Sequence, residues 1–460
     1  MRMFFLCLIV VLKGAVIVAA EDYIQPYKEN SFYWQLKGEP VLLLGGTVED
    51  NVYQIQDLEA HLDLLASVGG NYVRCTMSCR DEGDAWWFQK DAETGLYDLN
   101  TLGEDHWARF ETFMKLTAER GIVAQFEMWD RFDFARDFWQ GNPYNPKNNI
   151  NYTSEESGLA EDYKLHPGRK ESPFFRSVPA LENNELILEY QHKQVDRMLS
   201  VTLMYPHVLY CMDNETNESP EWGKYWSNYI KEKAKEAGVV VMTTEMWDAH
   251  DLNADAHKAT LDHPETYDFV DVSQNNHQVG KVHWDNPLAV RQYIIDSGHI
   301  RPINTVKIYG ANTGRYGTTR DAQERFWRNI LAGMASTRFH RPPAGLGLSE
   351  IPQEHIKSMR MALEVHDIFK SEPRLNLIGG RSVNEAYCSA NVGASYLVFF
   401  CDGGNVTLDV SGEGGRDLTV HWLDIRNGMW VGEAEGLVVE DGVVRLVTPD
   451  EEGYWAAVVR

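Results

Sequence analysis

The sequence predicts an α/β fold, a (β/α)8 TIM barrel followed by a small all-β sandwich domain. At 460 residues the chain has room for one barrel of about 250 to 350 residues and a second domain of about 80 to 100. From Val41 to about Pro373, short apolar runs alternate with amphipathic stretches, as in the repeated βα units of a parallel sheet. Beyond Pro373, short β-rich runs are separated by Gly, Asp and Asn turns, which is typical of an all-β domain.

Eight apolar runs are the candidate strands of the barrel. They are Val41–Gly45, Tyr72–Met77, Val123–Trp129, Val208–Asp213, Val239–Thr244, Phe269–Ser273, Ile303–Tyr309 and Ser336–Phe339. The amphipathic stretches between them predict helices over Asp57–Val68, Trp107–Arg120, Leu186–Leu199, Trp222–Ala237, Leu288–Ser297 and Ala322–Ala335. Eight strands in this order favour a closed barrel over an open doubly wound sheet. No Gly-x-Gly-x-x-Gly or Walker-type loop follows the first strand, so a nucleotide-binding fold is not indicated.

One connection is too long and too polar to be an ordinary loop. The segment Arg131–Pro179 follows the third candidate strand and is rich in Asn, Pro, Tyr and Trp. Because active sites of such barrels are built from loops at the carboxyl ends of the strands, we expect this insertion to overhang one face. Further along, Thr318-Thr319-Arg320-Asp321 has the form of a capping box, and a last helix is expected over Gln353–Phe369.

The N-terminus has the composition of a secretory signal peptide. A short basic start, Met1-Arg2-Met3, precedes an apolar stretch from Phe4 to Val18 and the small residues Ala19 and Ala20. Cleavage after Ala20 is expected, which predicts a secreted or periplasmic protein. The predicted domains are therefore the signal peptide 1–20, the barrel 21–373 and the β-sandwich 374–460.

The charge of the chain excludes two classes of partner. A formal charge of −25 argues against nucleic acid and against an anionic membrane, because both demand a basic face. An acidic polysaccharide is likewise a poor fit unless the cleft is locally basic. The chain also carries 14 Trp, 21 Tyr and 18 Phe; we expect most of them in the core, but aromatic rings in a cleft would be stacking platforms for sugar rings.

Neither a metal nor another cofactor is predicted. Of the five cysteines left after cleavage, Cys75, Cys79 and Cys211 have no matching His-rich cluster, and single histidines are more often hydrogen-bonded loop residues than ligands. Cys388 and Cys401 flank neighbouring β-rich runs and could pair in an oxidising compartment, and the sequence leaves that pairing open. The oligomeric state is not indicated.

The most specific local motif is an apolar strand that ends in Asn214-Glu215. Glycoside hydrolysis needs two carboxylates that face the scissile bond, one of them protonated, and a nearby amide can bind the adjacent sugar hydroxyl. At the end of the fourth strand of a barrel, Glu215 and Asn214 would supply one carboxylate and the amide.

The chain resembles the glycoside hydrolases of clan GH-A, in particular apiosidase-like members that end in a small sandwich named after a collagenase's collagen-binding domain. The matching stretches are Gly38–Thr47, Gly69–Arg74, Asn214-Glu215, Phe326–Ala335 and Trp422–Gly428. The resemblance implies a carbohydrate substrate, with Glu215 as acid/base and Asn214 as the hydroxyl-binding amide. It also implies that Arg74 is an orienting cation and that His277 lies near the second carboxylate.

The seventh strand departs from the family pattern. Where the family places its nucleophilic Glu, Arg301–Gly310 has Val306 and Lys307, and neither can act as a carboxylate nucleophile. Lys307 could instead lower the pKa of a neighbouring carboxyl group by ion pairing, and Tyr309 could serve as the nucleophile.

Two other strands offer a second carboxylate. Glu245 ends the fifth strand and Glu127 lies near the end of the third, each within the sequence Glu-Met-Trp-Asp. We expect Glu245 to be the second catalytic carboxylate, with Glu127 as runner-up, and Trp247 and Trp129 to contact substrate, although packing would equally explain the repeated motif. The sequence thus predicts a secreted glycoside hydrolase acting on a plant or algal saccharide, and the alternative is a barrel that binds carbohydrate without cutting it.

Overall fold

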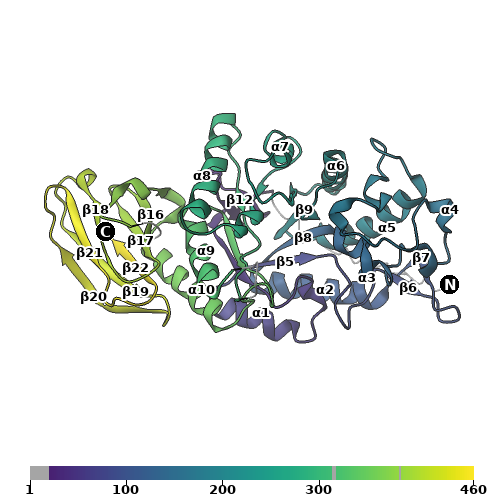
Figure 1. Cartoon of the computed structure of the whole chain (residues 1–460), viewed down its shortest axis with the longest axis horizontal. Coiled ribbons are helices and arrows are strands. Elements are labelled where there is room, and N and C mark those ends of the chain that lie inside the picture. The colour runs from purple at the N-terminus through teal and green to yellow at the C-terminus, as the bar shows by residue number, and fades with distance from the viewer. Residues whose placement is uncertain (1–19, 313–316, 383–384) are drawn as a thin grey trace, which may run out of the picture.

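A computed structural model describes residues 20–312, 317–382 and 385–460. Its centre is a barrel of eight parallel strands. These are β4 (Leu43–Gly46), β5 (Tyr72–Thr76), β8 (Val123–Asp130), β9 (Val208–Asn214), β10 (Met242–Thr244), β11 (Val270–Asp271), β12 (Ile303–Asn304) and β13 (Ser336–Phe339). Each lies within or overlaps one of the eight predicted runs, so the predicted strand order is confirmed (Figure 1).

The barrel closes through backbone hydrogen bonds at two seams. Six strands pair in the order β10-β9-β8-β5-β4-β13, and β11 pairs with β12 in parallel. The Asp268 N–H donates to the Thr243 carbonyl and the Ala335 N–H donates to the Ile303 carbonyl, both at 2.8 Å. These bonds join the two groups of strands into a ring, which brings all eight carboxyl ends to one mouth.

Helices cover the outside of the barrel. They are α1 (Leu58–Ser67), α2 (Glu104–Arg120), α5 (Glu185–Thr202), α6 (Pro220–Ala237), α7 (Asp255–Leu261), α8 (Gly280–Ser297), α9 (Thr319–Leu331) and α10 (Glu350–Leu363). The predicted capping box starts α9: the Thr318 side chain accepts the Asp321 N–H and the Asp321 side chain accepts the Thr318 N–H. Helix α8 starts earlier than predicted because it continues through Pro287, and the short α7 was not predicted.

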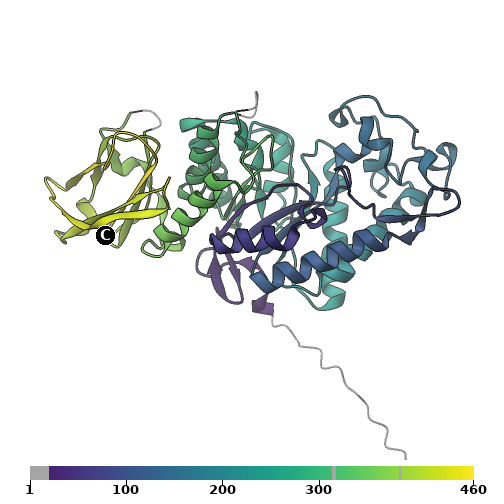
Figure 2. The same ribbon diagram turned by 90° about the horizontal axis from the view of Figure 1, so that it is seen from below.

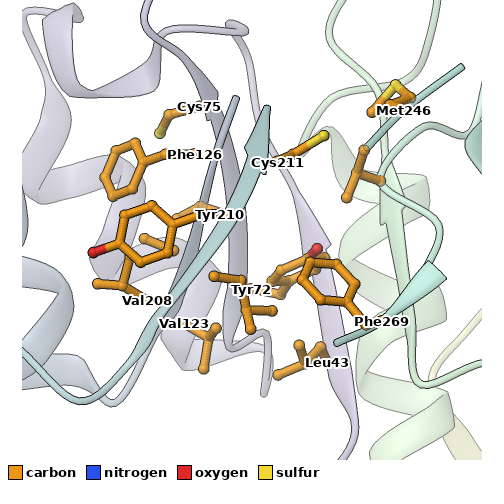
Figure 3. Packing of buried hydrophobic residues seen from close by; sticks show 14 of the residues in the cluster. Leu43, Tyr72, Cys75, Val123, Phe126, Val208, Tyr210, Cys211, Met246 and Phe269 are labelled. Atoms are coloured by element: carbon orange, nitrogen blue, oxygen red, sulfur yellow. The ribbon is translucent and has the colours of Figure 1, made fainter. Parts of the chain in front are cut away.

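Every residue of β5, β8 and β9 is buried. Opposing strands fill the inside of the barrel and helices cover the outside, so these strands show no polar alternation. Figure 3 shows this packing, with Phe126 of β8 and its register partner Tyr210 of β9 side by side. A small sheet of β1 (Gln25–Pro26), β2 (Trp34–Leu36) and β3 (Glu39–Val41) packs on the barrel through Trp34, whose Nε1 donates to Asn304 Oδ1 at 2.9 Å.

The segment Arg131–Pro179 is an insertion between β8 and α5, as expected. It contains the short helices η3 (Arg131–Phe134), α3 (Arg136–Trp139), η4 (Pro146–Asn148), α4 (Ser154–Ser157), η5 (Pro167–Arg169) and η6 (Pro173–Arg176). Aromatic packing holds it together, since the rings of Phe134 and Phe174 stack 3.9 Å apart. A hairpin of β6 (Phe88–Lys90) and β7 (Tyr97–Leu102) lies beside it. Figures 1 and 2 place the insertion at the end of the molecule away from the C-terminal strands.

The C-terminal part is all β, as predicted. The larger sheet has the order β14 (Glu372–Pro373), β16 (Ala386–Asn391), β17 (Ser395–Phe400), β22 (Trp455–Val459), β19 (Leu418–Asp424) and β20 (Met429–Leu437). The smaller sheet has the order β15 (Ile378–Gly379), β18 (Asn405–Asp409) and β21 (Val443–Val447). All these strands pair antiparallel, and side chains from both sheets form a shared core.

The two faces of the larger sheet have different neighbours. Cys388 lies in the core shared with the smaller sheet, whereas Cys401 belongs to the cluster shared with the barrel. The side chains therefore lie on opposite sides of the sheet and do not form the disulfide that the sequence left open. On the barrel side, Phe399 of β17 stacks on Trp327 of α9 with ring centroids 5.3 Å apart.

Two regions of the chain bear on its location. The predicted signal peptide, apart from Ala20, lies outside the described residues. None of the helices in the described ranges is both long enough and apolar enough to cross a membrane.

The contact between sheet and barrel predicts a large effect of Phe399→Ala. Removing a fully buried aromatic ring should lower the free energy of unfolding by about 3–5 kcal/mol, because it leaves a cavity against Trp327. Urea unfolding followed by tryptophan fluorescence measures this change. Val438→Ala, at a side chain that is 75% exposed, is the control and should change the free energy by less than about 0.5 kcal/mol. Equal changes in the free energy of unfolding of the two variants would show that the contact between Phe399 and Trp327 does not stabilise the protein.

Candidate active site

A cleft of about 580 Å³ opens at the mouth of the barrel. It is lined by Asp50, Arg74, Arg80, Arg131, Phe132, Arg136, Phe138, His166, Asn214, Glu215, Asp248, His250, Gln274, His277, Lys307, Tyr309, His340 and Arg341. Each of the eight strands, or the segment directly after it, contributes to this lining. The cleft therefore occupies the position where barrels of this type carry their active sites.

Glu215 and Lys307 form an ion pair at the centre of the cleft. Lys307 Nζ donates to Glu215 Oε1 at 2.5 Å and to Asn214 Oδ1 at 2.6 Å, and the Tyr309 hydroxyl donates to Glu215 Oε1 at 3.2 Å. The side chains of Lys307 and Glu215 are only 2% and 14% exposed, so little water screens the two charges. Glu215 also has a φ of +54°, a left-handed conformation that costs a non-glycine residue about 1–3 kcal/mol and is concentrated at functional sites.

This environment keeps Glu215 ionised. Burial alone would raise the pKa of the Glu215 carboxyl group, but the charge and hydrogen bond of Lys307 outweigh burial and hold the pKa far below its ordinary value. The predicted effect of Lys307 on a neighbouring carboxyl group therefore acts on Glu215 itself. Burial, followed by the charges of Glu215 and Asp50, raises the pKa of Tyr309 well above its usual value. Tyr309 is thus a hydroxyl donor, and the expected alternative of a Tyr309 nucleophile does not fit.

Arg74 lies beneath Asn214, as expected of an orienting cation. Its fully buried guanidinium group pairs with Asp50 and Glu127 and donates to Asn214 Oδ1 at 2.8 Å. Asn214 Nδ2 in turn donates to Asp130 Oδ2 at 3.0 Å. The amide oxygen of Asn214 therefore faces two cations, and its orientation is fixed from both ends.

Glu127 does not face the cleft. Its carboxylate is fully buried, pairs with Arg74 and takes no part in the lining. Burial raises its pKa in spite of the opposing charges of Arg74 and Lys307. Its position does not support the predicted alternative of Glu127 as a catalytic carboxylate, and its partner is Arg74.

Glu245 points away from the cleft, toward helix α6. Its Oε1 accepts the N–H groups of Asp213 and Met246, both at 2.9 Å. A Cβ atom added to Gly223 of α6 would lie 2.2 Å from Glu245 Oε2, so the carboxylate lies directly under the helix. Burial raises the pKa values of Glu245 and Asp213 well above normal. The charge of Asp213 adds to the rise for Glu245, and the charge of Glu218 adds to the rise for Asp213. This position, outside the lining of the cleft, does not support the predicted role of Glu245 as the second catalytic carboxylate.

Trp129 and Trp247 are packing residues. Trp129 is 1% exposed and its ring contacts Phe174, Trp222 and Trp226. Trp247 is 3% exposed and its Nε1 donates to Thr260 Oγ1 at 2.8 Å. Neither residue lines the cleft, so their predicted contact with substrate does not fit the structure.

Asp248 is the carboxylate that the sequence analysis missed. It is the last residue of the second Glu-Met-Trp-Asp motif and lines the cleft, where Arg131 Nη2 lies 2.6 Å from its Oδ2. Asp248 follows Glu245 by three positions in the same motif, and only Asp248 lines the cleft.

His277 lies in the cleft, as predicted. Its ring stacks on His250 at 3.7 Å and meets the Tyr309 ring edge-on at 5.6 Å. Burial, and then the neighbouring His250, lower its pKa to about 4, so His277 is a neutral hydrogen-bonding group at neutral pH. Gln274, which was not predicted, also lines the cleft beside Glu215. Gln274 is buried, and the hydrogen bond of its side chain to Glu215 helps to lower the pKa of that carboxyl group.

Known structures share this fold. A glycoside hydrolase family 5 protein from Bacteroides vulgatus has a TM-score of 0.63 and 15% identity, covering 95% of this chain and 93% of that one. A protein named only as a glycoside hydrolase has a TM-score of 0.63 and 12% identity, covering 95% and 97%. At these identities the likeness shows the fold alone, and the apiosidase-like subtype and the type of C-terminal domain stay predictions. Neither family models nor curated proteins gave a match to the sequence.

The buried pair of Asp213 and Glu245 predicts a pH-dependent stability. Folding raises the pKa values of both groups. Their contribution to the free energy of unfolding is therefore fully present below about pH 4, where both carboxyl groups are protonated even in the unfolded chain. It is lost as the pH rises through their pKa values in the folded protein. Glu245→Gln should therefore raise the melting temperature at pH 8 and flatten its decline with pH, without loss of any hydrolytic activity.

The measurement is calorimetry between pH 5 and pH 9. The matched control is Glu236→Gln, at an exposed position of α6, which should leave the profile unchanged. A lower melting temperature for Glu245→Gln than for the parent at pH 8 would contradict a buried pair that is destabilised by ionisation.

Proposed function

We propose that this protein is a glycoside hydrolase whose ionised catalytic carboxylate is Glu215. The observation that carries the proposal is the position of Glu215: it ends the fourth barrel strand, lines the cleft and is held by Lys307 and Tyr309. The fold likeness to glycoside hydrolases supports the same class of reaction. The strained backbone at Glu215 is further support, because such strain persists where a side chain must be aimed.

The ion pair with Lys307 indicates which catalytic role Glu215 has. Hydrolysis needs one ionised and one protonated group on either side of the glycosidic bond. Since Lys307 favours the ionised form of Glu215, Glu215 acts as base or nucleophile rather than as the acid that the family resemblance implies. Lys307 is then the positioning residue that keeps this carboxylate charged and oriented.

Asp248 is the proposed proton donor. It is the other carboxylate on the cleft wall that is accessible to solvent, with a side chain that is 33% exposed. In the unliganded cleft Arg131 holds it as an ion pair. A substrate group that binds Arg131 would break this pair and leave Asp248 facing the leaving oxygen as the general acid.

Gln274 is the proposed hydroxyl-binding residue. Gln274 lines the cleft beside Glu215, and its side-chain hydrogen bond to that carboxylate places the amide where a bound ligand would meet it. A sugar hydroxyl can both accept from and donate to such an amide.

We further propose that residues 1–20 are removed, that the barrel spans 21–373 and the β domain 374–460, and that the enzyme acts outside the cytoplasm on a plant or algal saccharide.

Variants of the two carboxylates should respond differently to the leaving group. Glu215→Gln should abolish hydrolysis of every substrate, because no base or nucleophile is left. Asp248→Asn should reduce kcat/KM by about 10²–10⁴-fold on saccharides, and far less on aryl glycosides whose phenolate leaves without a proton. Initial rates on a matched pair of alkyl and nitrophenyl glycosides measure this difference. Equal losses of Asp248→Asn on both substrates would remove Asp248 as the acid.

A second function is favoured by one observation. Lys307 stands on the strand where the resemblance places a catalytic Glu, and its charge neutralises Glu215. A barrel that binds carbohydrate without cutting it would have these properties. Release of reducing sugar from a polysaccharide panel, compared between the parent and Glu215→Gln, separates the two functions: binding without release by the parent would support the binding barrel.

A further inference from the structure

The lining of the cleft is basic although the chain is acidic. The whole chain has 43 Lys and Arg against 68 Asp and Glu. In the lining the proportion is reversed, with six Lys and Arg against the three carboxylates of Asp50, Glu215 and Asp248. Surface charge of one sign gathered in a cleft attracts ligands of the opposite sign. The arrangement of these cations then decides which of them are available to a ligand.

Most of the lining cations are already bound by carboxylates. Arg80 Nη1 lies 2.6 Å from Asp130 Oδ2 and 3.2 Å from Asp133 Oδ1, while Arg341 lies 2.7 Å from both Glu49 and Asp50. Arg74 and Lys307 are paired as described above. Buried cations need such partners, so these four fix the shape of the cleft and are not free to bind a second anion.

Two arginines of the insertion also line the cleft: Arg136 differs from these four, and Arg131 is paired with Asp248, a carboxylate of the cleft itself. Arg136 is exposed in the cleft wall, and in the described part of the chain no carboxylate lies within ion-pairing distance of it. Its backbone is held at a φ of +54° by the hydrogen bond from its N–H to the Tyr163 carbonyl. Arg131 is 2% exposed and binds Asp248 and Asn217, and its buried Nε has no hydrogen-bond partner among the described residues.

Aromatic rings accompany these arginines on the same wall. Phe138 is 41% exposed and lines the cleft together with Phe132. The guanidinium group of Arg131 lies 5.3 Å from the Phe132 ring centroid, and the paired Arg80 lies 5.6 Å from that of Phe138. An exposed ring face can stack on a sugar ring, and an arginine beside it presents parallel N–H donors that match a carboxylate or sulfate group.

We propose that the cleft binds a saccharide that carries an acidic group, a uronate carboxylate or a sulfate ester, and that Arg136 and Arg131 hold this group. The proposal rests on the proposed function for its placement beside Glu215, but binding is separable from hydrolysis. An anion bound to Arg131 would also displace Asp248 from its ion pair, which makes the proton donor available only when the acidic substrate is in place.

Chemically matched polysaccharides test this proposal. One pair is a uronate polysaccharide and its carboxyl-reduced form, and the other is a sulfated polysaccharide and its desulfated form. Affinity is measured by calorimetry with full-length Glu215→Gln protein, so that no substrate is consumed. We expect binding of at least one acidic member, about tenfold or more weaker binding of its neutral counterpart, and a marked loss of affinity at high salt. The pair that shows the difference identifies the acidic group.

A second variant locates the contact. Adding Arg136→Gln should weaken binding of the acidic member by about tenfold or more and leave binding of the neutral member unchanged. The control is Arg445→Gln, which changes the net charge equally at an exposed position of β21 and should have no effect. Equal affinity for acidic and neutral members, no binding of either acidic member, or indifference to Arg136→Gln would each overturn the proposal.

The same experiments separate this proposal from the proposed function. Binding of an acidic saccharide that depends on Arg136, with no hydrolysis by the parent protein, would refute the hydrolase and support the acidic ligand. Hydrolysis of a neutral polysaccharide, with no preference for its acidic counterpart, would support the hydrolase and refute the acidic ligand.

Discussion

The ion pair between Lys307 and Glu215 is the interaction on which the rest of the cleft depends. Two opposite charges with almost no water around them must remain together, because removing one partner of a buried pair typically costs 3–5 kcal/mol. The pair fixes Glu215 in a backbone conformation that is otherwise unfavourable. It also binds Asn214, which ties the pair to Arg74 and through it to Glu127 and Asp50.

This network explains how an acidic chain can have a cleft lined by cations. Carboxylates that pair with these cations lie behind the lining, in residues such as Glu127 and Asp130 that do not reach the surface of the cleft. Each inner arginine is thereby neutralised and held rigid, as an active site requires of its supporting residues. The insertion after β8 adds the outer wall, where Arg136 is left without a carboxylate partner in the described chain.

The sequence predicted the barrel well because hydrophobic runs and amphipathic stretches depend on local chemistry. Side chains predicted at or near the carboxyl ends of strands do line the cleft, because those ends meet at the mouth of the barrel. They are Asn214, Glu215, Arg74, His277, Lys307 and Tyr309. The sequence could not show that Glu245 and Glu127 lie outside the lining, because strands buried on both faces give no alternation from which the direction of a side chain follows. Partners such as Lys307 and Asn214, 93 residues apart, become neighbours only when the ring of strands closes.

The most direct measurement is the pH dependence of kcat/KM for the parent protein and for Lys307→Met, with a substrate that the parent hydrolyses. If Lys307 holds the pKa of Glu215 far below normal, the parent will show no loss of activity from Glu215 protonation in the mildly acidic range. The variant, in which burial acts on Glu215 without compensation, will show an acidic limb shifted upward by more than one pH unit. Superimposable acidic limbs in the two proteins would contradict the central role given to this ion pair.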